Sequence, residues 1–234
     1  MELSQAINTL FSVRKFLDVP VEWDKIGKIL DAGRHAPSSG NVQNWRFVIV
    51  RNPELREQLA VAALKQHWIA NAPIIIVICA ELDKITHYYG ERGEKVYSIQ
   101  NTSLAVQNMM LTAHALGLGS SFVSAFDENE VIRLLGIPGN ARPYVIMPIG
   151  YSDDQPNPNL IHYELENMTY FEGYSTSKRV SSMDNTSWSW RYGDKARDAI
   201  VRAAGKAQSK IEKSAGEKSF QDFIAKIRKA FSRK

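Results

Sequence analysis

The chain has 234 residues and a single cysteine, Cys79. One cysteine cannot close an intramolecular disulfide and cannot by itself build a cysteine-based zinc site. A small disulfide-stapled secreted domain is therefore excluded. A reducing compartment such as the cytoplasm is the expected location.

Long apolar runs are also lacking. The longest, residues 72–80, is interrupted by Pro73 and is far shorter than the roughly 20 residues of a membrane-spanning helix. Residues 1–5 do not show the charged region, apolar core and cleavage site of a signal peptide. We therefore expect neither a membrane span nor a signal peptide.

Common catalytic motifs are missing too. The sequence contains no P-loop, no G-x-G-x-x-G, no G-x-S-x-G and no H-E-x-x-H. Its five histidines have no ligand spacing, so no metal site is predicted. Asp31, His35 and Ser38 or Ser39 carry the groups of a hydrolase triad, but triads draw their members from distant segments. We do not expect a hydrolase.

Charge is distributed unevenly along the chain. From residue 178 onward there are 15 Lys and Arg against 6 Asp and Glu, whereas the first 177 residues hold 14 against 19. A mildly acidic body with a basic extension argues against a nucleic-acid partner and favours a catalytic domain with an appended segment.

The hydrophobic pattern of the first 152 residues predicts helices and strands in alternation. Residues 74–79 form a β-branched run that is typical of a strand buried on both faces. Residues 97–116 lack an interior Gly or Pro and have few charges, so we expect a helix buried nearly all round. The remaining predicted elements are helices at 2–11, 21–33 and 53–64, a helix that starts with the capping box Asp127–Glu130 and ends at Gly136, and strands at 45–50, 120–124 and 144–149. An α+β or mixed α/β single domain is expected.

Two polar clusters stand out in this body. Ser12, Arg14 and Lys15 place a hydroxyl and two cations just after a short helix, which suits a phosphate group. Residues 37–43 offer hydroxyls, two carboxamides and backbone N–H groups that can satisfy a polar planar heterocycle. The alternatives are a solvated surface cluster for the first and an ordinary loop for the second.

Five segments, in this order, resemble the FMN-dependent nitroreductase family. They are residues 12–16 (SVRKF), 36–47 (APSSGNVQNWRF), 71–73 (NAP), 107–121 (QNMMLTAHALGLGSS) and 147–151 (MPIGY). The resemblance covers about residues 1–152. It implies an α+β fold with a mixed, mainly antiparallel sheet flanked by helices. It also implies an intertwined homodimer that holds FMN non-covalently at its interface, with NADH or NADPH as electron donor in a ping-pong cycle.

The resemblance also implies which residues contact FMN. Ser12 and Arg14 match the contacts to the phosphate and ribityl chain, and Lys15 is a candidate beside them. The family usually has a basic residue where Leu10 stands, and a Lys or Arg where residues 157–159 read Asn-Pro-Asn. The other implied contacts are Pro37, Ser38, Ser39 and Asn41 from the second subunit, Gln43 near the flavin, Asn71 close to the isoalloxazine, and Ser120 and Ser121 beside the ring. Lys15, Lys178 or Arg179 are the replacements considered for the missing cations.

The expected function is that of an oxidoreductase acting on nitroaromatic, quinone or similar small-molecule acceptors. Because the flavin carries the hydride, no catalytic side chain is expected. Tyr88, Tyr89 and Phe122 are aromatic candidates for substrate contact, with packing as the alternative. Other functions stay open: flavin fragmentation, dehalogenation or ring dehydrogenation within the same family, or a non-catalytic flavin-binding interaction protein.

The C-terminal part differs in composition from the body. We predict an FMN-binding domain over residues 1–174, a linker over 175–193 and a basic amphipathic helical extension over 194–234. Such a helix can pack on the dimer, contact an anionic membrane surface or contact another protein.

Overall fold

A computed structural model describes residues 1–156 and 162–174. The chain divides into two compact units, Met1–Pro158 and Asn159–Lys234. In the second unit, α7 (Leu165–Met168) is a single turn, and the rings of Tyr170 and Tyr174 lie 4.5 Å apart between centroids. The predicted linker and helical extension lie outside the described residues, as do residues 157–161.

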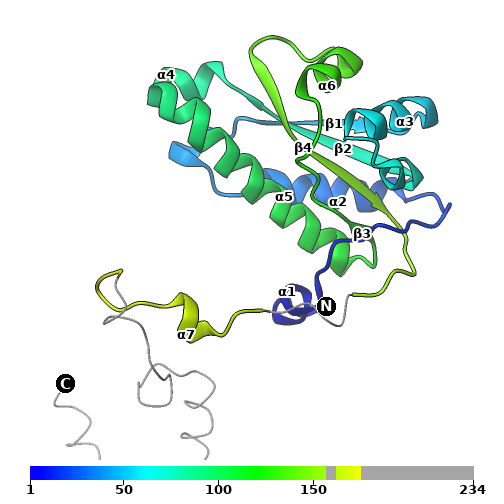
Figure 1. Ribbon diagram of the computed structural model, residues 1–234, viewed down its shortest axis with the longest axis horizontal. Coiled ribbons are helices and arrows are strands. Elements are labelled where there is room, and N and C mark those ends of the chain that lie inside the picture. The colour runs from blue at the N-terminus through cyan, green and yellow to red at the C-terminus, as the bar shows by residue number, and fades with distance from the viewer. Residues whose placement is uncertain (157–161, 175–234) are drawn as a thin grey trace, which may run out of the picture. The chain divides into compact units, whose positions relative to one another are not determined.

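The first unit is built on a four-stranded sheet with the order β1-β2-β4-β3 (Figure 1). Its strands are β1 (Trp45–Val50), β2 (Ile74–Glu81), β3 (Gly119–Ser120) and β4 (Ala141–Gly150), and every neighbouring pair is antiparallel. Trp45 lies opposite Ala80, and Ile74 lies opposite Ile149. The expected α+β class with a mainly antiparallel sheet is confirmed.

Strand β2 is buried on both faces, because its side chains alternate between two cores. Ile74, Ile76 and Ile78 belong to a core formed with α2 (Trp23–Arg34) and α5 (Ser98–Ala115). Ile75, Val77 and Cys79 belong to a second core formed with α3 (Pro53–Ala62) and α6 (Glu128–Leu135). The sheet is therefore the middle of three layers, as Figure 1 shows.

The helix boundaries follow local capping chemistry. Asn52 accepts a hydrogen bond from the Leu55 N–H at 2.9 Å, and Pro53 opens α3. Asp127 accepts from the Glu130 N–H at 3.2 Å, and Gly136 ends α6 with a φ of 61°. The predicted N-cap at Asp127 is confirmed, but the reciprocal bond of a capping box is not formed, because the Asp127 N–H donates to the Ala62 carbonyl and Glu130 pairs with Arg133. The N-terminal helix α1 (Leu3–Thr9) is shorter than expected.

Helix α5 contradicts one expectation. Ile99 and Leu104 are 47% and 44% exposed, whereas Val106 and Met109 on the other side are fully buried. The prediction that this helix is buried nearly all round is therefore wrong for the single chain, since one side packs on the sheet and the other faces outward. Within the described residues, no helix is long and apolar enough to cross a bilayer.

Helix α4 (Asp83–Arg92) and the π-helical turn η3 (Gly93–Tyr97) were not predicted. Gly90 breaks the helical pattern with φ 57° and ψ −147°, a conformation open almost only to glycine. Gly93 allows close packing, because a Cβ there would lie 2.4 Å from the Ile85 carbonyl oxygen. Because two glycines interrupt a polar stretch here, the sequence pattern does not predict a helix.

Candidate functional site

Residues 12–14 run beside β3 as an added strand-like segment. Ser12 forms a parallel bridge with Ser120, and the Val13 N–H donates to the Ser120 carbonyl at 3.1 Å. The Ser121 hydroxyl donates to the Val13 carbonyl at 2.6 Å. Val13 is buried, so the alternation of an extended chain exposes Ser12 and Arg14.

Strand β3 is shorter than the predicted strand 120–124. After Ser120 the chain leaves the ladder, and it pairs with β4 again through a bridge between Val123 and Ile146. The Ser121 hydroxyl is used on the Val13 segment, and the Ser121 N–H bond to Pro148 is long, at 3.4 Å. This departure from the sheet opens a pocket beside Arg14.

The pocket has a volume of about 170 Å³ and joins residues that are far apart in the sequence. The Arg14 guanidinium carbon lies 5.6 Å from the centroid of the Trp68 ring, a cation–π geometry. Trp68 belongs to the short helix η2 (His67–Asn71). The lining residues are Ser12, Arg14, Gln66, Trp68, Ser121, Phe122, Val123, Ser124 and Ala125.

No carboxylate of the described residues occupies the Arg14 side chain, which leaves it available to an anion in that part of the chain. Its backbone N–H donates to Asp154 Oδ2 at 3.1 Å, and this hydrogen bond is the main reason why the pKa of Asp154 lies below its ordinary value. Its guanidinium forms no ion pair with any carboxylate in residues 1–156 or 162–174. An unpaired guanidinium beside the Ser12 hydroxyl is a donor set that fits a phosphate group such as that of FMN.

Three other predicted contacts of this half lie outside the pocket lining. Lys15 is exposed, and its carbonyl accepts from the Ser152 hydroxyl at 2.6 Å. Ser120 is 2% exposed, and its hydroxyl has no partner in the described part of the chain. Asn71 is exposed at the end of η2, three residues after Trp68.

The loop over residues 37–43, which includes the turn η1 (Ser39–Asn41), is held by side chains and not by a strand ladder. Asn101 Oδ1 accepts from the Ser39 N–H at 3.0 Å and from its hydroxyl at 3.3 Å. The Gln43 N–H donates to the Ser38 hydroxyl at 3.1 Å, and the Gln43 amide donates to Asn41 Oδ1 at 3.1 Å. Ser38, Asn41 and Gln43 therefore form one connected group, and Ser39 is tied separately to Asn101.

Left-handed backbone shapes this loop. Gly40, Asn41 and Gln43 have φ values of 53°, 57° and 52°. At Gly40 a Cβ would lie 2.1 Å from the Tyr89 hydroxyl, so a larger residue there would have to displace the Tyr89 side chain, and the left-handed conformation favours glycine. Tyr89, a candidate for substrate contact, thus packs against the loop.

A buried amide network lies beneath the loop, and the sequence reading missed it. Asn101 Nδ2 donates to Asn44 Oδ1 at 2.9 Å, and Asn44 Nδ2 donates to the Ser98 hydroxyl and to the Glu81 carbonyl, both at 3.2 Å. All three network side chains are at most 2% exposed. The only sequence signal was polar residues at buried positions of a helix, which the resemblance had not singled out.

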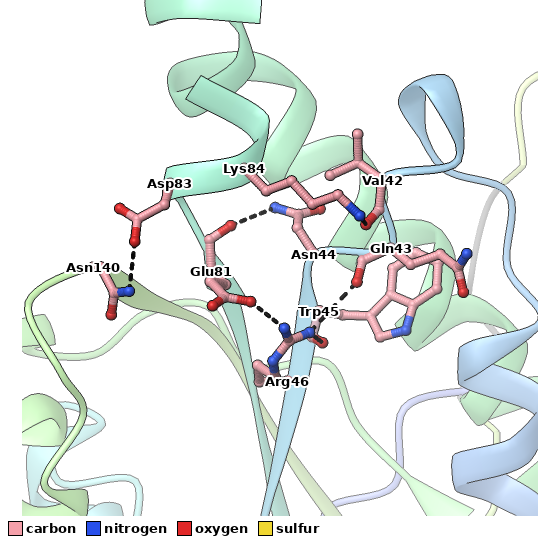
Figure 2. Close-up of polar contacts among 9 residues, drawn as sticks. All are labelled: Val42, Gln43, Asn44, Trp45, Arg46, Glu81, Asp83, Lys84 and Asn140. Atoms are coloured by element: carbon pink, nitrogen blue, oxygen red, sulfur yellow. Dashed lines mark hydrogen bonds and ion pairs between the residues drawn. The ribbon is translucent and has the colours of Figure 1, made fainter. Parts of the chain in front are cut away.

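Figure 2 shows how the end of the loop is tied to the sheet and to α4. Arg46 forms an ion pair with Glu81 across β1 and β2, and Lys84 Nζ donates to the Val42 carbonyl at 3.4 Å. Asn140 donates to Asp83 at 2.7 Å. The Arg46 and Lys84 contacts add to the buried amides at the point where the loop enters β1, whereas the Asn140 contact ties α4 to the turn before β4.

The loop and the Arg14 pocket do not share a cavity within one chain. Pro37, Ser38 and Ser39 line a pocket of about 460 Å³ against the outward side of α5, formed by Gln100, Asn101, Ser103 and Leu104. A third pocket, of about 360 Å³, has Ser103 in common with this one and Phe122 in common with the Arg14 pocket. The structure thus places the predicted residues in two groups, one at each end of this row of pockets.

The hydrolase alternative is met only in part. His35 Nδ1 lies 3.5 Å from Asp31 Oδ2, but Asp31 also pairs with Arg34 at 2.6 Å, and the two loop serines bond to Gln43 and Asn101 and not to His35. In the described ranges, no group of three or more His, Cys, Asp or Glu side chains could hold a metal ion. Burial raises the pKa of Cys79 to about 12, so its thiol stays protonated and unreactive.

Comparison with known structures identifies the class of fold. A nitroreductase family protein from Clostridium difficile 630 superposes with a TM-score of 0.65 at 28% identity, over 74% of this chain and 99% of that one. A nitroreductase family protein from Clostridium novyi NT gives a TM-score of 0.60 at 28% identity, over 66% of this chain and 87% of that one. The protein has the nitroreductase fold.

Sequence comparison gives the family. Residues 10–67 and 60–151 match the Nitroreductase family. A protein of Methanothermobacter thermautotrophicus, provisionally named NADH dehydrogenase/NAD(P)H nitroreductase, is 34% identical over 70% of this chain and 87% of its own length. A Bacillus subtilis protein named FMN reductase [NAD(P)H] is 26% identical over 66% of this chain and 67% of its own length. The chain belongs to the nitroreductase family, and these matches support an oxidoreductase in general terms.

Proposed function

We propose that the protein is an FMN-dependent oxidoreductase that uses NADH or NADPH to reduce nitroaromatic, quinone or similar acceptors in a ping-pong cycle. The observation that carries the proposal is the Arg14 pocket, with its unpaired guanidinium and adjacent Ser12 hydroxyl. Family membership adds the names of relatives that use NAD(P)H and FMN.

In this proposal Ser12 and Arg14 bind the FMN phosphate and the adjoining ribityl chain. A guanidinium offers two parallel N–H donors to an oxyanion, and stacking on Trp68 restricts the rotation of Arg14. With Leu10 at the position where the family usually has a cation, Arg14 provides most of the positive charge at the phosphate. Lys15 is exposed beside it and can add to the local potential.

The second half of the site is proposed to come from a second subunit. Ser38, Ser39 and the outward side of α5 line one pocket, and Ile99 and Leu104 expose apolar surface next to it. A second copy that covers this surface would bring its own loop toward the Arg14 pocket of the first. The proposed assembly is therefore a homodimer with the flavin at its interface.

FMN, when bound, supplies the redox chemistry by taking hydride from the nicotinamide and passing it to the acceptor. The protein residues bind and orient. The carboxamides of Gln43 and Asn71 are exposed and can donate to the carbonyl edge of a flavin, and Ser121 fixes the chain beside the ring through its bond to Val13. No side chain needs to move a proton in this scheme.

The test is an FMN titration of the purified protein followed by anaerobic addition of NADH or NADPH. We expect stoichiometric uptake of FMN, bleaching of the flavin absorbance by the reduced nicotinamide, and turnover with a nitroaromatic acceptor. Failure to take up FMN contradicts the proposal. Bound flavin that NADH and NADPH do not bleach favours a non-catalytic flavin protein, and bleaching without nitroaromatic or quinone turnover favours a specialised enzyme of the family.

The basic residues after position 174 are proposed to be an accessory to this chemistry. Deletion after Ser177 should leave FMN binding and turnover intact, and loss of flavin from a folded truncated protein would instead assign Lys178 or Arg179 to the cofactor site. Binding of the full chain to anionic vesicles that weakens with salt would point to a membrane contact. The single, buried cysteine fits the proposed cytoplasmic location.

A further inference from the structure

Arg56, which lies outside the Arg14 pocket, binds the backbone of η2, which carries the pocket residue Trp68 and the predicted flavin contact Asn71. From α3, Arg56 Nη1 donates to the Ala70 carbonyl at 2.8 Å and also to the Ala72 carbonyl. These two carbonyls flank Asn71, the last residue of η2. Arg56 therefore spans the backbone on both sides of Asn71.

Burial of the Arg56 side chain lowers the stability of the fold. Arg56 is partly buried, its Nε–H has no hydrogen-bond partner in the described part of the chain, and none of the ion pairs found there includes it. An apolar side chain of similar length would avoid the cost of desolvating a cation and an unpaired donor. What Arg56 supplies and an apolar residue cannot is a fixed geometry for the Ala70–Ala72 backbone.

The gripped turn presents side chains to the site. Trp68 forms the surface over which the Arg14 guanidinium lies, and Asn71 is the predicted isoalloxazine contact. A second tie from α3 joins Glu57 to His67 Nδ1 at 2.6 Å, but both side chains are more than half exposed. Exposed pairs of this kind hold weakly, so Arg56 is the principal restraint.

We propose that Arg56 is a positioning residue for the cofactor site, which it serves by fixing the η2 turn so that Trp68 meets Arg14 and Asn71 meets the flavin. This inference rests on the proposed FMN function. It adds a residue that lines none of the pockets described above and that acts through the backbone of another segment.

The experiment compares Arg56→Met and Arg56→Lys with the wild type and with Arg133→Met. Methionine keeps the apolar stem and removes every donor, whereas lysine keeps a charge that can reach one carbonyl but lacks the planar fork. Arg133 lies on α6 and pairs with Glu130 at the surface, so it is a matched arginine without contact to η2. Thermal unfolding of each variant establishes that it is folded.

Two readouts separate positioning from general stability. The first is the dissociation constant for FMN, which we expect to rise about tenfold in Arg56→Met, the order of one lost charge-assisted hydrogen bond, and less in Arg56→Lys. The second is the indole N–H signal of Trp68 in the NMR spectrum of the flavin-free protein, assigned with Trp68→Phe. It should shift in both Arg56 variants while the Trp45 signal does not.

A further test places Arg56→Met in a Trp68→Phe, Asn71→Ala background. If Arg56 acts through these two side chains, its effect on FMN affinity largely disappears there, because coupled residues are not additive. An undiminished effect overturns the proposal. So does wild-type FMN affinity in folded Arg56→Met, or loss of the cooperative thermal transition in both Arg56 variants, which would make the residue purely structural.

Failure of the proposed function is distinguishable from failure of this inference. If the wild-type protein binds no FMN, the proposed function fails, and the Trp68 signal of the flavin-free protein then decides whether Arg56 orders the turn. If the wild type binds FMN but the Trp68 signal of Arg56→Met stays unchanged, the function stands and the positioning role is overturned.

Discussion

The two halves of the predicted cofactor site are built in different ways. Ser12 and Arg14 sit on an extended segment that hydrogen-bonds to the sheet, so strand alternation alone turns them outward. The loop with Ser38 and Ser39 has no ladder, and it depends on Asn101 and on left-handed backbone at Gly40. The first half therefore lines one pocket of a single chain, whereas the second half borders an exposed apolar surface where a second copy is proposed to pack.

We expect the largest loss of flavin when the proposed dimer surface beside the second half of the site is disrupted. Leu104→Glu places a charge on the outward side of α5, where a second copy is proposed to pack, and burying an unpaired charge is strongly unfavourable. We expect a monomer that retains no flavin, seen by light scattering and absorbance. Val61→Glu on α3 is the control, since Val61 is similarly exposed, at 47%. A wild-type monomer that holds flavin stably would contradict the dimer.

The next effect concerns the first half. Arg14→Ala removes the unpaired guanidinium, and because a hydrogen bond to a charged group contributes about 1.5–3 kcal/mol, FMN binding should weaken roughly 10- to 100-fold. Isothermal calorimetry measures the change. Arg51→Ala is a matched control, because Arg51 lies over Trp23 at 4.9 Å in the same kind of cation–π contact, away from the pocket. Equal losses of FMN affinity in both variants would show that Arg14 does not bind the phosphate.

A smaller effect tests the buried amides that hold the loop. Asn101→Leu leaves the Asn44 carboxamide oxygen and the Ser39 N–H without their partner. Leaving a buried polar group unsatisfied costs about 1–3 kcal/mol, so the free energy of unfolding should fall by about that amount in urea titrations. Asn129→Leu, at an exposed position of α6, should change it little. Unchanged stability of Asn101→Leu would mean that the network does not hold the loop.

The smallest effect depends on pH. The Arg14 N–H lowers the pKa of Asp154 in the folded protein, so the carboxylate stabilises the fold above its unfolded-state pKa of about 3.9 and this contribution is lost as the pH falls through the lower folded value. Asp154→Asn should flatten that part of the stability profile and leave the profile at neutral pH nearly parallel to the wild type. The protection of the Arg14 N–H against hydrogen exchange, relative to its intrinsic rate at each pH, should fall in acid in the wild type. An identical acid profile in both proteins would assign the loss to other carboxylates.

The sequence predicted the sheet better than the site. Strand β1 was predicted with its exact ends, and the alternation of β2 between two cores followed from its unbroken apolar run. Helix α4 was missed because Gly90 and Gly93 interrupt its period. The early end of β3 depends on a hydroxyl bond from Ser121 to Val13, which local pattern cannot reveal.

For the site, the sequence supplied the residues but not their grouping. Ser12, Arg14 and Ser121 were singled out, and the structure brings them to one pocket across more than a hundred positions of the chain. Trp68 and Asn101 were not singled out, since an aromatic residue in a turn and a buried amide in a helix are usually packing residues. Only the tertiary structure shows that the first lies under Arg14 and the second holds Ser39.

The most direct measurement compares FMN with riboflavin, which lacks the phosphate, in the wild type and in Arg14→Ala. If Arg14 binds the phosphate, the wild type prefers FMN, and this preference falls roughly 10- to 100-fold in the variant while riboflavin affinity stays nearly constant. Equal weakening of both ligands, or a wild type that binds both equally, would contradict the assignment of the Arg14 pocket to the phosphate.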